Sequence, residues 1–173
     1  MTGTECATVW EGNLARILAF LSPDLDDWEG PVEIFRVPDG FLARCNYWAP
    51  ELQAFRGRRF LFATLKSSNR CRGTRIFISE SPTWPFRLHS DGPVTPADWD
   101  CLDRTQHVDG SGNPWMVFCH EWGHEICIIR LSEGLCYATE QPHLLFKASQ
   151  CSGLSGNSGR WGMRICYRRP VSF

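Results

Sequence analysis

Short apolar runs separated by turn residues recur about every 50 residues, and this repeat constrains the fold more than any other feature of the chain. The runs are short and interrupted by glycine and proline, which favours strands over long helices. The first full copy predicts strands at residues 47–55, 58–64, 74–79 and 86–89. The second copy predicts strands at residues 101–108, 114–122, 125–131 and 143–147.

The third strand of each copy ends with an apolar residue and a serine that lead into a turn. These serines are Ser22, Ser79 and Ser132, which lie 57 and 53 residues apart. Four strands in about 50 residues are typical of one blade of a β-propeller. Because a blade cannot bury both faces alone, such blades close into rings of roughly four to eight. The chain holds only about two and a half to three blades, so we predict an all-β partial propeller.

The composition argues against several other classes of protein. The 173 residues carry a net charge of −1, so the overall charge does not indicate a nucleic-acid partner. No apolar run reaches the ~18–20 residues of a membrane span, and the first residues lack the basic start of a secretory signal. We therefore expect a cytoplasmic protein without a membrane partner, whose nine cysteines are reduced thiols.

The last part of the chain differs from the repeat. Residues 151–173 contain four arginines and no aspartate or glutamate, and serine–glycine pairs replace the strand pattern. We therefore predict a partial propeller domain at residues 1–150 and a basic tail at residues 151–173. The tail is either a flexible extension or a segment that does not belong to the preceding fold.

The segment His120-Glu121-Trp122-Gly123-His124 matches the H-E-x-x-H signature of zinc proteases. That chemistry needs a helix, which places both histidines on one face. The surrounding sequence is rich in β-branched and aromatic residues, and an extended strand would hold the two histidines roughly 13 Å apart. We therefore predict no metal site here and keep a zinc protein only as a third hypothesis.

Two segments at equivalent places of the two copies could form a ligand site. Trp48 and Glu51 begin one blade and Asp103 begins the next, and the first strand of a propeller blade lines the central channel. An aromatic ring and carboxylates in one cavity suit a carbohydrate. Alternatively, Trp48 packs between blades and Asp103 caps a turn. Arg70 and Arg72 lie in a polar loop that either anchors a carboxylate or forms a solvated rim.

Several motifs, in the right order, resemble glycoside hydrolase family 43, the five-bladed β-propeller β-xylosidases and α-L-arabinofuranosidases. The resemblance covers roughly residues 22–149. The motifs that carry it are Tyr47-Trp48-Ala49-Pro50-Glu51-Leu52, Cys71-Arg72-Gly73-Thr74, residues 82–103 and residues 113–122. The resemblance implies a five-bladed propeller and inverting hydrolysis of xylosides or arabinofuranosides, with an oligosaccharide or glycoside as the partner.

The resemblance also implies roles for individual residues. Asp103 matches the aspartate that raises the pKa of the family's proton donor and holds the sugar. Trp48 and Glu51 are expected on the channel wall as substrate-binding residues, with His120 and Trp122 near it. The family needs no organic cofactor, so we expect none; a channel calcium ion occurs in some members and does not follow from this sequence.

Two of the family's three catalytic acids have no match in this sequence. No aspartate–proline strand precedes Leu14, and the resemblance stops after Ser149, before the strand that would carry the proton donor. We hypothesise a frameshift near Ser149 that leaves the tail out of frame, and we expect hydrolysis to be impaired. The alternative is a carbohydrate-binding or assembly module without catalysis, which could self-associate through open blade edges.

Overall fold

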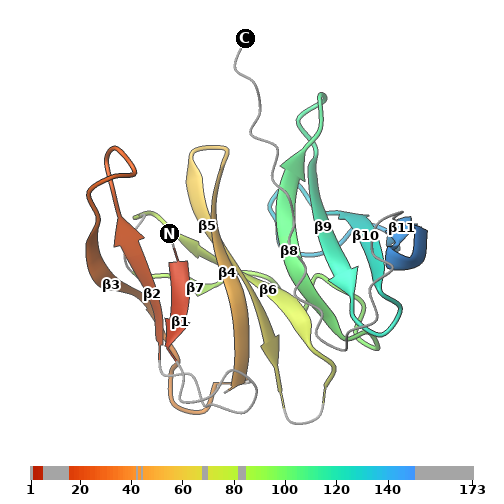
Figure 1. The fold of residues 1–173 in the computed structure, drawn as a ribbon, viewed down its shortest axis with the longest axis horizontal. Helices are drawn as coiled ribbons and strands as arrows, with labels where there is room; N and C mark the ends of the chain where they lie inside the picture. The colour runs from red at the N-terminus through yellow and green to blue at the C-terminus, as the bar shows by residue number, and fades with distance from the viewer. Residues whose placement is uncertain are drawn as a thin grey trace.

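Three antiparallel sheets stand side by side in the computed structural model of the protein, which describes residues 2–5, 16–41, 43, 45–67, 70–81 and 85–150 (Figure 1). The first sheet contains β1 (Thr2–Glu5), β2 (Arg16–Leu21) and β3 (Glu29–Arg36). The second contains β4 (Cys45–Phe55), β5 (Arg58–Lys66), β6 (Gly73–Ser79) and β7 (Arg87–Leu88). The third contains β8 (Cys101–Val108), β9 (Pro114–His120), β10 (Glu125–Arg130) and β11 (His143–Lys147).

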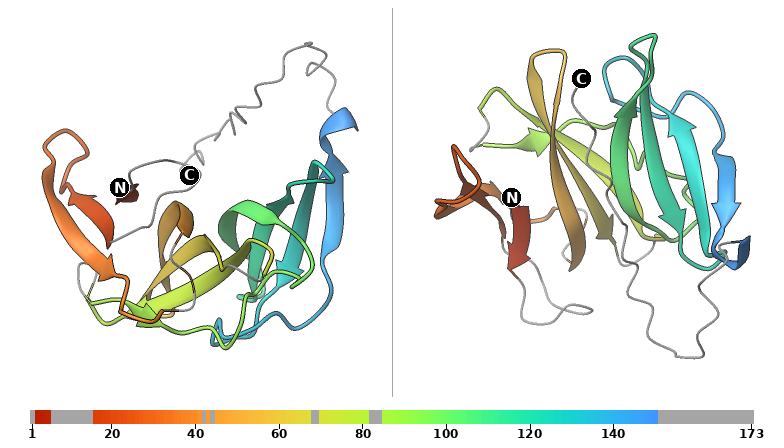
Figure 2. Two further views of the ribbon diagram at one scale, coloured as in Figure 1. Left: turned by 90° about the horizontal axis from the view of Figure 1, so that it is seen from below. Right: turned by 45° about the horizontal axis from the view of Figure 1, so that its top comes forward.

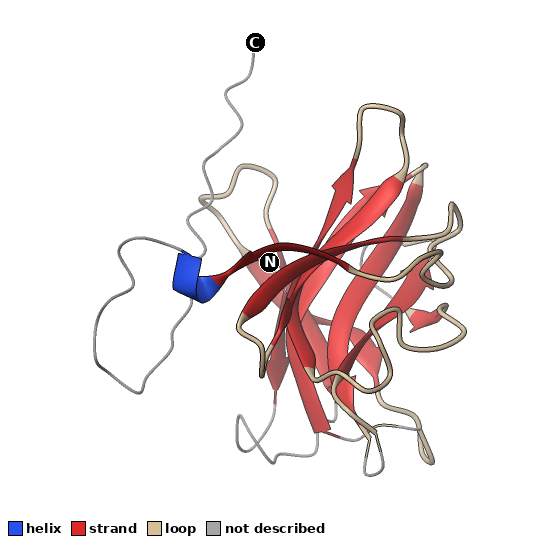
Figure 3. Ribbon diagram, turned by 90° about the vertical axis from the view of Figure 1, so that its right-hand side faces the viewer, coloured by secondary structure: helices blue, strands red, loops and turns tan. Residues whose placement is uncertain are grey.

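The sheets are arranged as blades around an open arc. Figure 2 shows this arc from below, with β4 and β8, the first strands of the second and third sheets, on its inner side. The regular secondary structure of the described part is all strand, apart from one 3-10 turn at Ala148–Gln150 (Figure 3). The all-β partial propeller predicted from the repeat is therefore confirmed. No helix among the described residues has the length and apolar character of a membrane span.

The second sheet is the structural centre because both of its faces are buried. Phe60 and Phe62 of β5 belong to the core shared with the third sheet, whereas Leu61 and Ala63 belong to the core shared with the first sheet. Successive strand residues point to opposite faces, so a strand buried on both sides reads as a continuous apolar run. Because both faces are buried, the side chains of residues 60–65 do not alternate between apolar and polar.

The predicted strand positions agree closely with the structure, with one informative difference. β8 and β11 have the predicted bounds, but β9 ends at His120 because residues 121–124 form a tight turn. His124 has a left-handed φ of 48° in this turn. A Cβ on Gly123 would lie 2.8 Å from the Glu125 carboxyl group, so glycine allows the chain to turn back closely.

Two parts of the sequence-based description lie outside the described residues. The predicted tail at residues 151–173 is one, and residues 6–15 are the other. The division into a domain at 1–150 and a separate tail stays a prediction.

Candidate active site

The first strand of the third sheet bulges at Asp103. The residues that flank Asp103 and Arg104 pair with Cys119 and Val117 of β9, so Asp103 and Arg104 together face a single residue of β9. Asp103 has a left-handed φ of 45°, which is uncommon for a residue other than glycine. Such a bulge redirects a side chain, and an unusual φ of this kind is most often kept at functional positions.

The first strand of the second sheet has the same bulge at Ala49 and Pro50. The flanking residues Trp48 and Glu51 pair with β5 two residues apart, although they are three residues apart in β4. Ala49 has a left-handed φ of 42°. The two strands therefore share one local geometry, in which Ala49 occupies the position in β4 that Asp103 occupies in β8.

Arg104 joins these two bulges. Its side chain is only 5% exposed, and its guanidinium donates hydrogen bonds to the backbone carbonyl oxygens of Trp48, at 3.3 Å, and of Ala49 and Phe62. Burial lowers the pKa of Arg104 to about 10, which still leaves it charged at neutral pH. Arg104 thus fixes the first strands of neighbouring sheets relative to each other.

The pKa of Asp103 is raised above the ordinary aspartate value of 3.8. Burial raises the pKa of Asp103, and the nearby negative charge of Glu121 raises it further, while the positive charge of Arg104 opposes both effects. Burial also raises the pKa of the Cys119 thiol to about 11, so Cys119 stays neutral beside Asp103. Asp103 is therefore a half-buried carboxyl group whose pKa is raised mainly by burial.

Arg72 connects Trp48 to Glu121 from the loop between β5 and β6. Its guanidinium lies 4.3 Å from the centre of the Trp48 ring and forms an ion pair with Glu121. Arg72 is only 8% exposed, whereas Arg70 in the same loop is exposed. The expectation of a solvated rim is therefore wrong for Arg72, because its charge is shared between an aromatic face and a carboxylate.

Asp100 holds this loop against the turn after β9. Its carboxylate accepts a hydrogen bond from the backbone N–H of Arg72, at 2.7 Å, and one from the indole N–H of Trp122, at 2.9 Å. Its backbone carbonyl accepts the N–H of Glu121. Burial alone would raise the pKa of Asp100, but these hydrogen bonds to the carboxylate outweigh it and leave the pKa lowered.

Glu51 ties β4 to β8. Its Oε1 accepts hydrogen bonds from the Thr105 hydroxyl, at 2.9 Å, and from the Gln53 amide, at 2.6 Å. Its Oε2 is buried and has no hydrogen-bond partner among the described residues. Glu51 therefore has a structural role between the sheets and also one carboxylate oxygen that a ligand or a water molecule could satisfy.

His120 and Trp122 lie at the same end of the sheet but have other contacts. The His120 ring stacks on Trp99, with centroids 4.2 Å apart, and its Nδ1 lies 3.2 Å from the carboxylate of Glu125. Trp122 is 74% exposed, although its indole N–H is bound to Asp100. The structure thus gathers Trp48 and Asp103 around Arg72 and Glu121, while His120 packs against other residues.

The H-E-x-x-H segment does not have zinc-protease geometry. His120 ends strand β9 and His124 lies in the following turn, whereas that chemistry needs both on one helix face. In the part of the chain that the structure describes, no three His, Cys, Asp or Glu side chains converge on a point that could hold a metal ion.

Comparisons with known proteins bear on this site. The model of the family described as glycosyl hydrolases family 43 matches residues 6–165, which extends beyond residues 22–149 in both directions. The crystal structure of an endo-arabinase from Bacteroides thetaiotaomicron VPI-5482 is 36% identical with a TM-score of 0.74, and the match covers 78% of this chain and 49% of that one. No curated protein sequence matches significantly.

Two further solved structures share the fold at lower identity. An α-L-arabinofuranosidase from Clostridium thermocellum ATCC 27405 is 22% identical with a TM-score of 0.59, and the match covers 75% of this chain and 45% of that one. A GH43_1 enzyme from Xanthomonas citri, in complex with xylotriose, is 14% identical with a TM-score of 0.67, and the match covers 83% of this chain and 50% of that one. The chain thus spans about half the length of these proteins.

Proposed function

Because the chain belongs to glycosyl hydrolases family 43, we propose that its site serves the hydrolysis of O-glycosidic bonds in arabinofuranosides or xylosides, by an inverting mechanism. The observation that carries this proposal is the half-buried Asp103, held in the left-handed bulge of β8 on the inner side of the arc. In this proposal Asp103 hydrogen-bonds the sugar and raises the pKa of the proton donor.

The chemistry assigned to Asp103 follows from its charge. An inverting glycosidase needs one carboxylic acid that protonates the leaving oxygen and one carboxylate that activates water on the opposite face of the sugar. A third carboxylate near the acid raises the acid's pKa and keeps it protonated at working pH. This role requires the ionised form of Asp103, which the positive charge of Arg104 favours against the burial and the Glu121 charge that raise the pKa of Asp103.

We expect hydrolysis by this chain to be impaired. Among the described inner strands, β8 carries Asp103 at its bulge, but β4 carries Ala49 at the equivalent position. No residue of this sequence has been assigned to the family's general base or proton donor. A carboxylate that positions a sugar without a proton donor or a general base supports binding far better than bond cleavage.

Arabinofuranosyl substrates are the first to test. The endo-arabinase from Bacteroides thetaiotaomicron is 36% identical to this chain, which favours an arabinose-containing substrate over a xyloside. Trp48 offers an aromatic surface of the kind on which sugar rings stack, and Arg72 and Glu121 beside it offer polar groups for sugar hydroxyls.

The test is the release of product from 4-nitrophenyl α-L-arabinofuranoside, 4-nitrophenyl β-xyloside and linear arabinan by the full chain. We expect turnover close to background. Robust turnover that Asp103→Asn removes would contradict the expected impairment, because it would require acids that the sequence does not reveal. The matched control is Asp39→Asn, since Asp39 is an exposed carboxylate in a turn outside the site.

A second candidate function is that of a carbohydrate-binding or assembly module without catalysis. The outer strand β11 favours it, because Leu144, Leu145 and Phe146 are each at least 42% exposed. Exposed apolar edge strands tend to pair with another chain. Light scattering coupled to gel filtration distinguishes the two candidates, because a well-behaved monomer at high concentration argues against the assembly module.

A further inference from the structure

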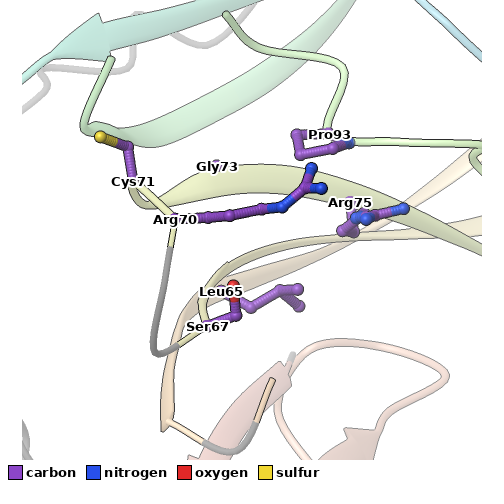
Figure 4. Close-up of a pocket in the computed structure, with 7 residues that line it drawn as sticks. All are labelled: Leu65, Ser67, Arg70, Cys71, Gly73, Arg75 and Pro93. Atoms are coloured by element: carbon purple, nitrogen blue, oxygen red, sulfur yellow. The ribbon is translucent and has the colours of Figure 1, made fainter. Parts of the chain in front are cut away.

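A small pocket on the second sheet gathers two arginines without an acidic partner. Its volume is about 20 Å³, and it is lined by the loop after β5, the start of β6 and Pro93. Arg70 reaches it from the loop and Arg75 from β6, and Figure 4 shows both guanidinium groups on the same side of β6 next to Pro93. Among the described residues, no carboxylate lies within ion-pair distance of either arginine.

Arg75 is the unusual member of this pair. It is only 8% exposed, and the one hydrogen bond that its guanidinium makes with the described residues is a long one, 3.4 Å, to the backbone carbonyl of Ser90. A guanidinium has five N–H donors, and a buried cation is unfavourable unless it is paired. Burial and the positive charge of Arg70 both lower the pKa of Arg75. A bound anion would offset both effects.

The walls of the pocket keep it open for a small group. Gly73 has no side chain, and a Cβ there would lie 3.0 Å from Pro93 and 2.9 Å from the Thr95 hydroxyl. The volume has room for about one water-sized group, which excludes a sugar ring but accepts an oxygen of a carboxylate or a phosphate. Two guanidinium groups suit such an oxyanion because they donate several hydrogen bonds in a fixed geometry.

We propose that the pocket between Arg70 and Arg75 binds a small oxyanion, either a carboxylate carried by a ligand or a free phosphate. The pocket is distinct from the group around Asp103, although Arg72 of the same loop contacts Trp48 there. The proposal does not depend on the proposed hydrolysis, because its test involves no glycosidic bond.

The test is calorimetric titration of the full chain with inorganic phosphate and, separately, with glucuronate, at constant ionic strength. We expect saturable binding of at least one of them, and the tighter one identifies the source of the oxyanion. Glucose is the neutral control for glucuronate. Absence of saturable binding of both anions would overturn the proposal, and so would binding of glucuronate no tighter than that of glucose when phosphate does not bind.

Arg70→Gln tests the site directly, because Arg70 is exposed and its replacement should not disturb folding. We expect the dissociation constant for the anion to rise at least tenfold, since one of two charged donors is lost. Arg58→Gln is the matched control, because Arg58 is an exposed arginine at the opposite end of β5 and should leave binding unchanged. Unchanged binding in Arg70→Gln would contradict the site.

Arg75→Gln separates binding from a purely structural role. If Arg75 is held ready for an anion, its replacement removes an uncompensated buried charge, so the melting temperature without anion should stay the same or rise. The increase in melting temperature that phosphate gives by binding the folded state should disappear. A lower melting temperature without anion, combined with an unchanged response to phosphate, would assign Arg75 to packing and overturn the proposal.

Discussion

Arg104, in the bulge of β8, donates a hydrogen bond to the backbone carbonyl of Ala49, in the equivalent bulge of β4. The same guanidinium also binds the carbonyls of Trp48 and Phe62. One buried cation thus sets the spacing between the first strands of two blades. This contact fixes the position of the bulge that contains Asp103 relative to the strand that carries Trp48.

Replacement of Arg104 should therefore destabilise the protein strongly. Arg104→Ala removes the donor from the buried carbonyl of Phe62 and from the partly buried carbonyls of Trp48 and Ala49, and an unsatisfied buried group costs about 1–3 kcal/mol. We expect the free energy of unfolding to fall by about 3 kcal/mol or more in urea denaturation. Arg87→Ala, at an exposed position of β7, is the control and should change it by less than about 0.5 kcal/mol. Equal effects of the two substitutions would contradict the linking role of Arg104.

Asp103→Asn should raise stability at neutral pH. The pKa of Asp103 is raised in the folded state, mainly by burial, so its ionisation favours unfolding as the pH rises through the folded pKa. Asparagine removes this effect and also tolerates a left-handed φ well. We expect a higher melting temperature than wild type at pH 7, with the difference shrinking toward pH values below about 3.8, the ordinary pKa of aspartate.

The control for this measurement is Asp39→Asn, which should leave the melting temperature unchanged across the same pH range. A melting temperature of Asp103→Asn below that of wild type at pH 7 would show that the carboxylate is satisfied in the folded state. Such a result would argue against the environment described for Asp103.

Asp109, in the hairpin between β8 and β9, should affect the pH dependence of stability in the opposite direction to Asp103, because its pKa is lowered. The Asp109 carboxylate accepts hydrogen bonds from the Asn113 side chain and the Trp115 indole, which, with backbone N–H groups, hold its pKa well below the usual range. This contribution to stability is present above the unfolded pKa of about 3.8 and is lost as the pH falls through the folded pKa.

Asp109→Ala should therefore lower the melting temperature at pH 7, and the difference from wild type should narrow in strong acid. Thermal unfolding between pH 2 and pH 8 measures this, with Asp39→Ala as the exposed control. A difference that stays constant down to the lowest pH would show that the carboxylate charge is not the cause.

The sequence predicted the blades because their signal is local. Apolar runs that end in a serine and a turn fix the strand boundaries, and β8 and β11 were predicted to the residue. The equivalence of the strands that begin at Trp48 and at Asp103 could also be predicted, since both occupy the same place in the repeat. The structure adds that the two strands share one bulge.

The contacts that shape the site could not be predicted in this way. Arg72 binds Glu121, which is 49 residues away in sequence, and Arg104 binds backbone carbonyls of another sheet. The sequence next to each arginine does not indicate which residue it contacts. The strand that carries Arg104 is itself mostly polar, so the burial of this arginine is not indicated by its own surroundings in the sequence.

Isothermal titration calorimetry with arabinotriose is the most direct test of the site around Asp103, because binding requires neither a general base nor a proton donor. We predict saturable binding by the wild-type chain, at least tenfold weaker binding by Asp103→Asn, and unchanged binding by Asp39→Asn. The absence of binding by the wild type, or equal affinity in wild type and Asp103→Asn, would contradict the assignment of the site around Asp103 to a glycoside.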